Sequence, residues 1–170
     1  ALKNNIHYNI KYCYCSSDFG LVTAVIVHDV LQIVHPPVSA IMSSLDKGLM
    51  KNCWEGHENI FTPKSIKIRS ETELIDACDK SSFPLVLKPL DSSGSRGVSV
   101  LHNEKEIKDA YIEAKRYSLD GFLLLEEYID GAHHDVNGLF WSEKFYECGV
   151  MDRHFISGKY PVSYKGNYPS

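Results

Sequence analysis

The stretch FPLVLKPLDSSGSRGVSV, residues 83–100, decides how the rest of the chain is interpreted. Residues 84–90 form a continuously apolar run, typical of a buried strand, and Lys88 lies within it. A lysine in an apolar strand is costly unless it meets an anion. The serine- and glycine-rich loop at 91–97 follows at once, and its N–H groups and hydroxyls could surround phosphate oxygens. The stretch predicts either a phosphate-binding strand and loop or an ordinary hairpin turn with a lysine that reaches solvent.

Three familiar site patterns do not fit this chain. The only Gly-Lys pair, Gly158 and Lys159, is not followed by the serine or threonine of a Walker A loop. Gly94 and Gly97 are three apart, and no third glycine completes a GxGxxG pattern. The serines of the loop also lack the GxSxG elbow of a serine-dependent hydrolase. A phosphate site here requires a different architecture.

The composition is that of a globular protein. The chain has 170 residues, of which 44% are hydrophobic and 24% charged, and a net charge of −4. No basic stripe is present that could replace the counterions of a nucleic acid, so we expect no nucleic-acid partner. The apolar run at 20–34 contains polar residues and is shorter than the roughly 18 to 20 residues of a membrane span. The first residues do not resemble a signal peptide, so the expected location is the cytoplasm.

Apolar periodicity and capping residues predict the order of elements. Residues 11–15, KYCYC, read as a strand with Cys13 and Cys15 on one face, and we expect at least one of these thiols to be buried and all five cysteines to be reduced. Ser70 and Asn103 are expected to cap two helices. The predicted helices span 19–33, 38–52, 70–79 and 103–118, and the predicted strands span 65–68, 84–90, 98–101 and 122–125.

The last part of the chain reads differently. Residues 136–141 and 144–150 are predicted to form a hairpin that turns at Ser142 and Glu143. The tail from 157 to 170 shows no periodicity and is expected to be a loop. This mixed order of elements favours an α+β fold over a doubly wound sheet.

Four motifs, in this order, carry a resemblance to a known family: LDKGLMK (45–51), TP (62–63), FPLVLKPLDSSGSRGVSVL (83–101) and LLLEEYIDG (123–131). Together they resemble the ATP-grasp superfamily, and within it the carboxylate-amine ligases related to the carbamoyl-phosphate synthase large subunit and biotin carboxylase. The resemblance implies an α+β ATP-grasp fold with a complete small lobe at 61–126 and a truncated large lobe at 127–170. Residues 1–37 would end a pre-grasp α/β domain, and 38–60 would connect the two.

The resemblance also implies roles for individual residues. Lys47 and Lys88 match the two lysines that contact ATP, although Lys47 alone would read as part of a solvated helix face. The hinge strand, where relatives bind adenine, would supply Glu126, Glu127 and Ile129; without the resemblance the two glutamates could simply end a buried strand. The glycine-rich flap over the triphosphate would be formed by Ser92, Ser93, Gly94, Ser95 and Gly97.

Two positions are less regular. Many members place a glutamate for the ribose a few residues after the hinge, and His133 occupies that position here. Arg153 falls where relatives carry a basic residue near the terminal phosphate, so it is the candidate catalytic residue, with an ordinary surface arginine as the alternative. His133, His134 and Asp135 are consecutive, and neighbouring strand residues point to opposite faces, so no metal site is predicted there.

The implied chemistry is ATP-dependent activation of a carboxylate as an acyl phosphate, followed by attack of an amine. ATP and Mg²⁺ are the implied cofactors, a small carboxylate and an amine are the implied substrates, and a homodimer is an allowed assembly. The acidic Mg²⁺ ligands of the family are expected downstream of this chain, which we therefore expect to be a fragment. The alternative is a non-catalytic nucleotide-binding remnant or interaction module.

Overall fold

The structure is a computed structural model that describes residues 10–156 and 162–167. The chain divides into two compact units, one formed by Ala1–Thr62 with Leu90–Ser93 and the other by Pro63–Pro89 with Gly94–Ser170. None of the helices in the described ranges combines the length and the apolar character needed to cross a membrane.

The first unit is helical. It contains a short 3₁₀ turn, η2 (Asp18–Gly20), and the helices α2 (Leu21–Val30), α3 (Val38–Leu45) and α4 (Lys47–Trp54). The predicted strand at 11–15 is wrong: this segment has no regular structure, and the backbone N–H of Cys13 donates to the Nε2 atom of His28 at 2.9 Å instead. A strand needs a partner, and no described segment of this unit pairs with it. Cys13 and Cys15 are both half-buried, so the expected burial is also wrong.

The single helix predicted at 38–52 is two helices, because Asp46 interrupts it. Asp46 has an extended backbone (φ −110°, ψ 117°), and its carboxylate accepts a hydrogen bond from the backbone N–H of Leu49 at 2.8 Å. Aspartate side chains compete for backbone donors in this way, which favours a cap over a helix interior. The interruption makes Lys47 the first residue of α4.

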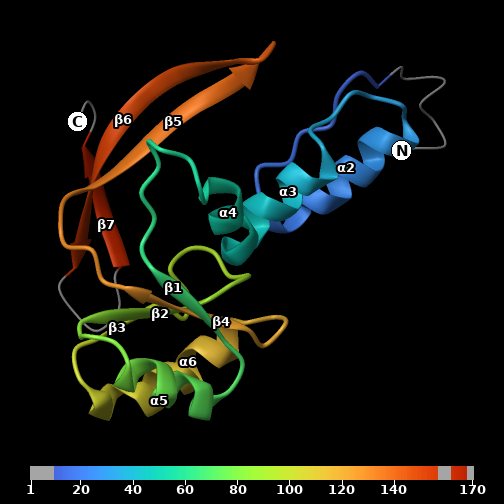
Figure 1. The fold of residues 1–170 in the computed structure, drawn as a ribbon. Coiled ribbons are helices and arrows are strands. Elements are labelled where there is room, and N and C mark those ends of the chain that lie inside the picture. The colour runs from blue at the N-terminus through green and yellow to red at the C-terminus, as the bar shows by residue number, and fades with distance from the viewer. Residues whose placement is uncertain (1–9, 157–161, 168–170) are drawn as a thin grey trace. The chain divides into compact units, whose positions relative to one another are not determined.

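The second unit contains a four-stranded antiparallel sheet, which we call sheet A (Figure 1). Its order is β1-β4-β2-β3, so the last strand in sequence lies between the first two. The helix caps predicted at Ser70 and Asn103 are confirmed, since both side chains accept hydrogen bonds from the turns that follow. The elements are β1 (Ser65–Ile68), α5 (Glu71–Asp79), β2 (Leu85–Pro89), β3 (Ser99–Leu101), η3 (Glu104–Glu106), α6 (Ile107–Tyr117) and β4 (Leu123–Glu127).

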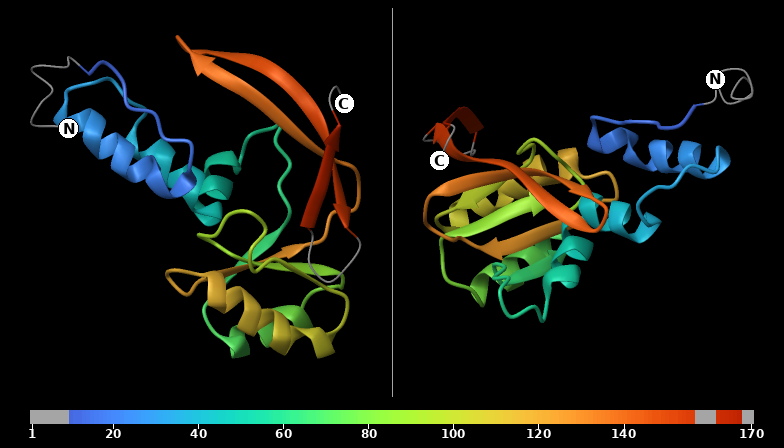
Figure 2. Two further views of the ribbon diagram at one scale, coloured as in Figure 1. Left: turned by 180° about the vertical axis from the view of Figure 1, so that it is seen from behind. Right: turned by 90° about the horizontal axis from the view of Figure 1, so that it is seen from above.

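One face of sheet A carries the core. Helices α5 and α6 lie on the same side of the sheet, as the views in Figures 1 and 2 show. The alternation of each strand directs one set of side chains toward these helices. This set includes Leu87, which is fully buried, and the cluster is completed by Ile68, Leu74, Ala77, Cys78, Leu85, Leu101, Ile107, Ala110, Ala114, Leu123 and Leu125.

The other set of side chains points to what we call the helix-free face of sheet A. By register it contains Lys67, Val86, Lys88, Val100, Leu124 and Glu126.

A three-stranded antiparallel sheet, sheet B, follows with the order β5-β6-β7. Strands β5 (His133–Trp141) and β6 (Lys144–Ile156) form the predicted hairpin, and Ser142 and Glu143 make its turn with positive φ angles of 46° and 64°. The expected loop is wrong for part of the tail, because β7 (Val162–Asn167) pairs with β6. The rest of that prediction, 157–161 and 168–170, lies outside the described residues.

Candidate nucleotide-binding site

Lys88 lies on the helix-free face of sheet A and forms an ion pair with Glu126. Its Nζ atom is 2.5 Å from Oε2 of Glu126, and the two side chains are 21% and 5% exposed. Strands β2 and β4 are neighbours, and the register sets Lys88 opposite Leu124 and Val86 opposite Glu126, so the pair is diagonal on one face. A lysine in an apolar strand requires an anion as its partner, and Glu126 is that anion. Sequence analysis named both residues without pairing them, because the pairing of β2 with β4 is not readable from sequence.

An apolar floor adjoins this ion pair. Val86 and Val100 are directly opposite each other across β2 and β3, and Leu124 lies between the strands that carry Lys88 and Lys67. Sequence analysis missed these positions, although the two-residue spacing between Val86 and Lys88 places both side chains on one face. A polar pair beside apolar side chains is the usual lining of a small-molecule site.

The glycine-rich loop has left-handed backbone conformations at Gly94 (φ 66°), Ser95 (φ 57°) and Gly97 (φ 72°). A Cβ atom at Gly97 would lie 2.9 Å from Cγ of Pro89 and 3.2 Å from Cα of Ala114, so this end of the loop is packed against β2 and α6. A Cβ at Gly94 would meet nothing within 4 Å. The loop thus has a fixed end and an uncrowded tip, where backbone N–H groups can approach a ligand.

Lys47 belongs to the first unit and holds the segment where this loop starts. Its ammonium donates hydrogen bonds to the carbonyl oxygens of Leu90, at 3.2 Å, and of Ser92. The backbone N–H of Lys47 donates to the same Leu90 oxygen at 3.1 Å. Carbonyl oxygens carry no net charge, so these bonds orient the ammonium without neutralising it.

Two hinge residues after Glu126 differ in their surroundings: Glu127 is hydrogen-bonded within the fold, and Ile129 is exposed. The carboxylate of Glu127 accepts a hydrogen bond from the backbone N–H of Lys64 at 2.8 Å, and the backbone N–H of Glu127 donates to the Lys64 carbonyl at 3.1 Å. This carboxylate therefore joins the start of β1 to the end of β4. Ile129 is 58% exposed.

Sheet B brings His133 and Arg153 together as cross-strand neighbours of β5 and β6. The guanidinium of Arg153 pairs with Asp135, with Nε 3.2 Å from Oδ2, and the His133 ring contacts Phe155 at a centroid distance of 4.7 Å. Arg153 also lines a hollow of about 410 Å³ with residues of the glycine-rich loop, Gly94, Ser95, Arg96 and Gly97, and with Glu113, Tyr117 and Ser163. Arg153, chosen from the sequence, thus shares a hollow with the loop.

The described residues do not fit a magnesium site. His134 bonds Asp152 at 2.8 Å on the face of sheet B opposite to that of His133 and Asp135, which separates the three consecutive residues as alternation predicts. Residues 10–156 and 162–167 contain no group of three histidine, cysteine, aspartate or glutamate side chains placed to hold a metal ion. None of the described residues is therefore assigned to Mg²⁺.

Comparison with known proteins identifies the family. The ATP-grasp domain model matches residues 46–169, which is most of the chain and includes every site residue named above. The chain belongs to the ATP-grasp family. The predicted family and the predicted α+β ATP-grasp fold are both confirmed.

Three matches, one curated protein and two solved structures, show how much of the chain is similar to known proteins. A D-alanine–D-alanine ligase of Nitrosomonas europaea is 28% identical over 110 residues, which cover 62% of this chain and 35% of the relative. The crystal structure of an L-amino acid ligase from Bacillus licheniformis matches 96% of this chain and 39% of its own, with 16% identity and a TM-score of 0.74. The biotin carboxylase domain dimer of Hydrogenobacter thermophilus 2-oxoglutarate carboxylase, in complex with MgADP and bicarbonate, matches 89% of this chain and 36% of its own, with 19% identity and a TM-score of 0.71.

The chain spans about a quarter to a third of the length of the first curated relatives it matches. The two structural matches are below 25% identity and therefore establish the fold alone.

Proposed function

We propose that this chain is the ATP-binding portion of an ATP-dependent ligase that activates a carboxylate for attack by an amine. The observation that carries the proposal is the position of Lys88. It is an ammonium mounted on a rigid strand, on the sheet face that bears the apolar floor, six residues before the uncrowded Gly94 of the loop. A lysine on a strand is a fixed point charge for a phosphate, and loop donors can add hydrogen bonds around it.

The adenine would lie on the apolar floor formed by Val86 and Val100. Backbone groups of the hinge near Glu127 and Ile129 would read the purine edge, while the Glu126 carboxylate would accept a hydrogen bond from the amino group. Glu126 is 5% exposed and already oriented by Lys88, so it needs little reordering on binding. This division leaves the Glu127 carboxylate to its structural bond with Lys64.

The triphosphate would extend from Lys88 along the glycine-rich loop, with Ser92, Ser93, Gly94, Ser95 and Gly97 as its cover. Lys47 would add the second positive charge assigned from the family pattern. Arg153 is proposed near the terminal phosphate because it shares a hollow with the loop, and His133 is proposed near the ribose as its cross-strand neighbour. Closure of a loop over such a site excludes water from a reactive acyl phosphate.

The reaction proposed for the whole protein has two steps. A carboxylate oxygen attacks the terminal phosphorus of ATP and releases ADP, and the amine then attacks the acyl carbon and releases phosphate. The proposal covers the carboxylate-amine ligase class, within which the carbamoyl-phosphate synthase type remains a prediction. The cytoplasmic location and the homodimer likewise remain predictions.

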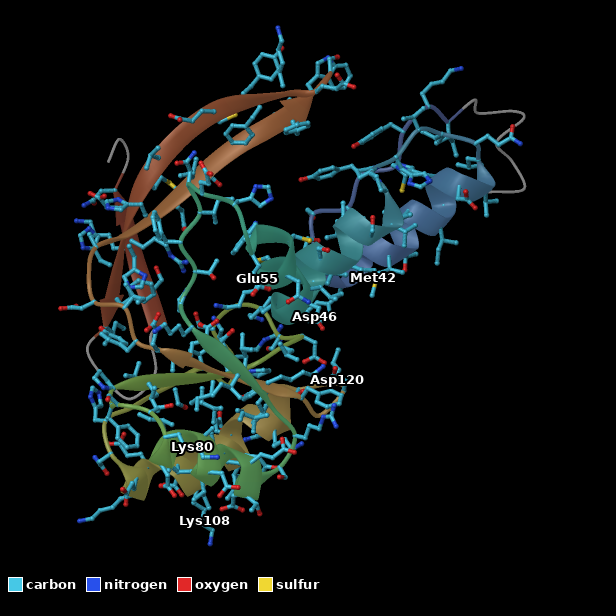
Figure 3. The ribbon with its side chains drawn as sticks, in the orientation of Figure 1. Met42, Asp46, Glu55, Lys80, Lys108 and Asp120 are labelled. Atoms are coloured by element: carbon cyan, nitrogen blue, oxygen red, sulfur yellow. The ribbon has the colours of Figure 1, made fainter. Side chains whose placement is uncertain are left out.

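The test is titration calorimetry of the chain with a non-hydrolysable ATP analogue. Lys88→Ala is expected to weaken binding by about 1.5 to 3 kcal/mol, the loss of a charged hydrogen bond. The double variant Lys88→Met with Glu126→Gln removes both charges at similar volume, so its weaker binding would not reflect a buried unpaired carboxylate. Lys108→Ala, on the outer side of the helix layer, is the control and is expected to bind as the wild type does (Figure 3). Equal affinity of all four proteins would exclude the phosphate role of Lys88.

A further inference from the structure

A second group of cations lies beside the nucleotide site, at the end of β1. The Nζ atom of Lys67 is 3.9 Å from the centroid of the Phe122 ring, and the guanidinium carbon of Arg69 is 5.6 Å from the same centroid. Both side chains are exposed. A cation held on an aromatic face is oriented while its charge stays available, because the ring offers a quadrupole and no counter-charge. Phe122 therefore contacts two positive charges, each within about 6 Å of its ring centroid.

Neither cation is neutralised by a carboxylate. Across residues 10–156 and 162–167, the ion pairs that the structure contains do not include Lys67 or Arg69. Two carboxylates accept hydrogen bonds from the backbone of this region; they keep their negative charge but form no ion pair with Lys67 or Arg69. The Asp120 carboxylate bonds the N–H of Phe122 at 2.8 Å, and the Glu73 carboxylate bonds the N–H of Arg69 at 2.8 Å.

A third cation strengthens the local positive field. Lys115 donates from its ammonium to the carbonyl oxygens of Arg69, at 3.3 Å, and of Gly121. It thereby joins the end of β1 to the loop that leads into Phe122. Its partners are uncharged, so Lys115 adds to the positive potential around Lys67 and Arg69.

This group is distinct from Lys88 by register and by charge balance. Lys67 and Lys88 are opposite Leu124 on either side of β4, on the same helix-free face. Lys88 has Glu126 as its ion-pair partner, and Lys67 has no ion-pair partner among the described residues. On this face, the lysine without an ion-pair partner is therefore on β1, and β4 separates it from Lys88 on β2.

We propose that Lys67 and Arg69, held on Phe122, form a second anion-binding site that takes the phosphate group of a small molecule. Two adjacent cations match a doubly charged oxyanion, and a guanidinium presents paired donors that fit phosphate oxygens. A ligand carboxylate carries a single negative charge and would balance only one of the two cations. This site uses none of the residues assigned to ATP, so it can be tested separately from the proposed function.

The test is a two-dimensional amide NMR titration of the chain with inorganic phosphate at constant ionic strength. We expect saturable shifts of the amides at 67–69 and 122, with affinity about tenfold weaker in Lys67→Gln and in Arg69→Gln, the scale of a lost charged hydrogen bond. Both replaced side chains are exposed, so the fold should be kept, and thermal unfolding monitored by circular dichroism checks this. A second titration uses glycerol 3-phosphate. Comparing its affinity with that of inorganic phosphate shows whether the site prefers free phosphate or a phosphate ester.

Two controls make the outcome decisive. Lys108→Gln removes one positive charge from the helix layer, where the side chain points away from sheet A, and should leave the affinity unchanged (Figure 3). Acetate should bind more weakly than phosphate. The proposal is overturned by shifts that do not saturate, by equal weakening in Lys108→Gln, or by saturable shifts of the loop amides at 92–97 with unchanged phosphate affinity in Lys67→Gln. The last result would assign the phosphate to the nucleotide site alone.

Discussion

The Lys88 ammonium is the counter-charge of a Glu126 carboxylate that is 95% removed from solvent, with 2.5 Å between Nζ and Oε2. The two residues come from strands that are adjacent in sheet A and 38 positions apart in sequence. Neither residue can be replaced without changing the other's electrostatic environment. The pair therefore connects the stability of sheet A to the proposed nucleotide site.

Replacing Lys88 by alanine should destabilise the fold by about 3 to 5 kcal/mol, because it leaves Glu126 as an uncompensated buried charge. The double variant Lys88→Met with Glu126→Leu removes both charges and should recover most of this loss. Urea unfolding at pH 7 measures the free energies. If Lys88→Ala were as stable as the wild type, the buried Glu126 carboxylate would not need Lys88 as its counter-charge.

The tip and the fixed end of the glycine-rich loop should respond differently to alanine. Gly97→Ala places a Cβ 2.9 Å from Pro89 and 3.2 Å from the Ala114 backbone, in addition to the strain of a φ of 72°. Gly94→Ala pays for the left-handed backbone alone, about 1 kcal/mol, because its Cβ meets no atom within 4 Å. We expect Gly97→Ala to lower the free energy of unfolding by more than Gly94→Ala does. Equal losses would contradict the packed position of Gly97.

The Cys78 thiol should make stability depend on alkaline pH. Burial, together with the nearby negative charges of Asp79 and Glu104, raises the pKa of Cys78 from 9.0 to about 11. The unfolded chain then releases this proton at lower pH than the folded chain, so the contribution is complete below pH 9 and is lost as pH rises toward 11. The loss should be about 2 kcal/mol. Urea unfolding at pH 8 and pH 11 should show it in the wild type; in Cys78→Ala the pH dependence should be smaller by that amount.

The cap of α5 gives a fourth measurable effect. Ser70 accepts a hydrogen bond from the N–H of Glu73 at 3.2 Å, and Glu73 in turn accepts one from the N–H of Arg69. Ser70→Ala should cost about 1 kcal/mol of unfolding free energy. Thr72→Ala, an exposed change in the first turn of the same helix, should cost nothing because alanine is the better helix former. Similar losses in both would mean that the cap contributes little.

Local signals in the sequence predicted most of the second unit. Strand 65–68, the caps at Ser70 and Asn103, and the hairpin turn at Ser142 and Glu143 each depend on a few neighbouring residues, and the structure has all of them. The failures depend on partners that are distant in sequence. The segment 11–15 has strand propensity but no strand to pair with, whereas 162–167 has no visible pattern and forms β7 on the edge of β6.

The candidate site divides in the same way. Lys88 and the loop could be chosen from sequence because an apolar run followed by serines and glycines is a local pattern. The ion pair of Lys88 with Glu126 and the stacking of Lys67 and Arg69 on Phe122 required the strand order β1-β4-β2. The alternation of polar and apolar residues within single strands does not show that β4 lies between β1 and β2.

The order β1-β4-β2-β3 also affects how sheet A can assemble during synthesis. Strand β1 emerges first, and its sole partner in the sheet, β4, begins at Leu123, more than 50 residues later. Until that strand is made, β2 and β3 can form a hairpin, but β1 presents unpaired backbone groups on both edges. A ribosome that pauses before Leu123 would therefore hold a chain prone to wrong pairing, and the sheet would close cooperatively once β4 inserts between its neighbours.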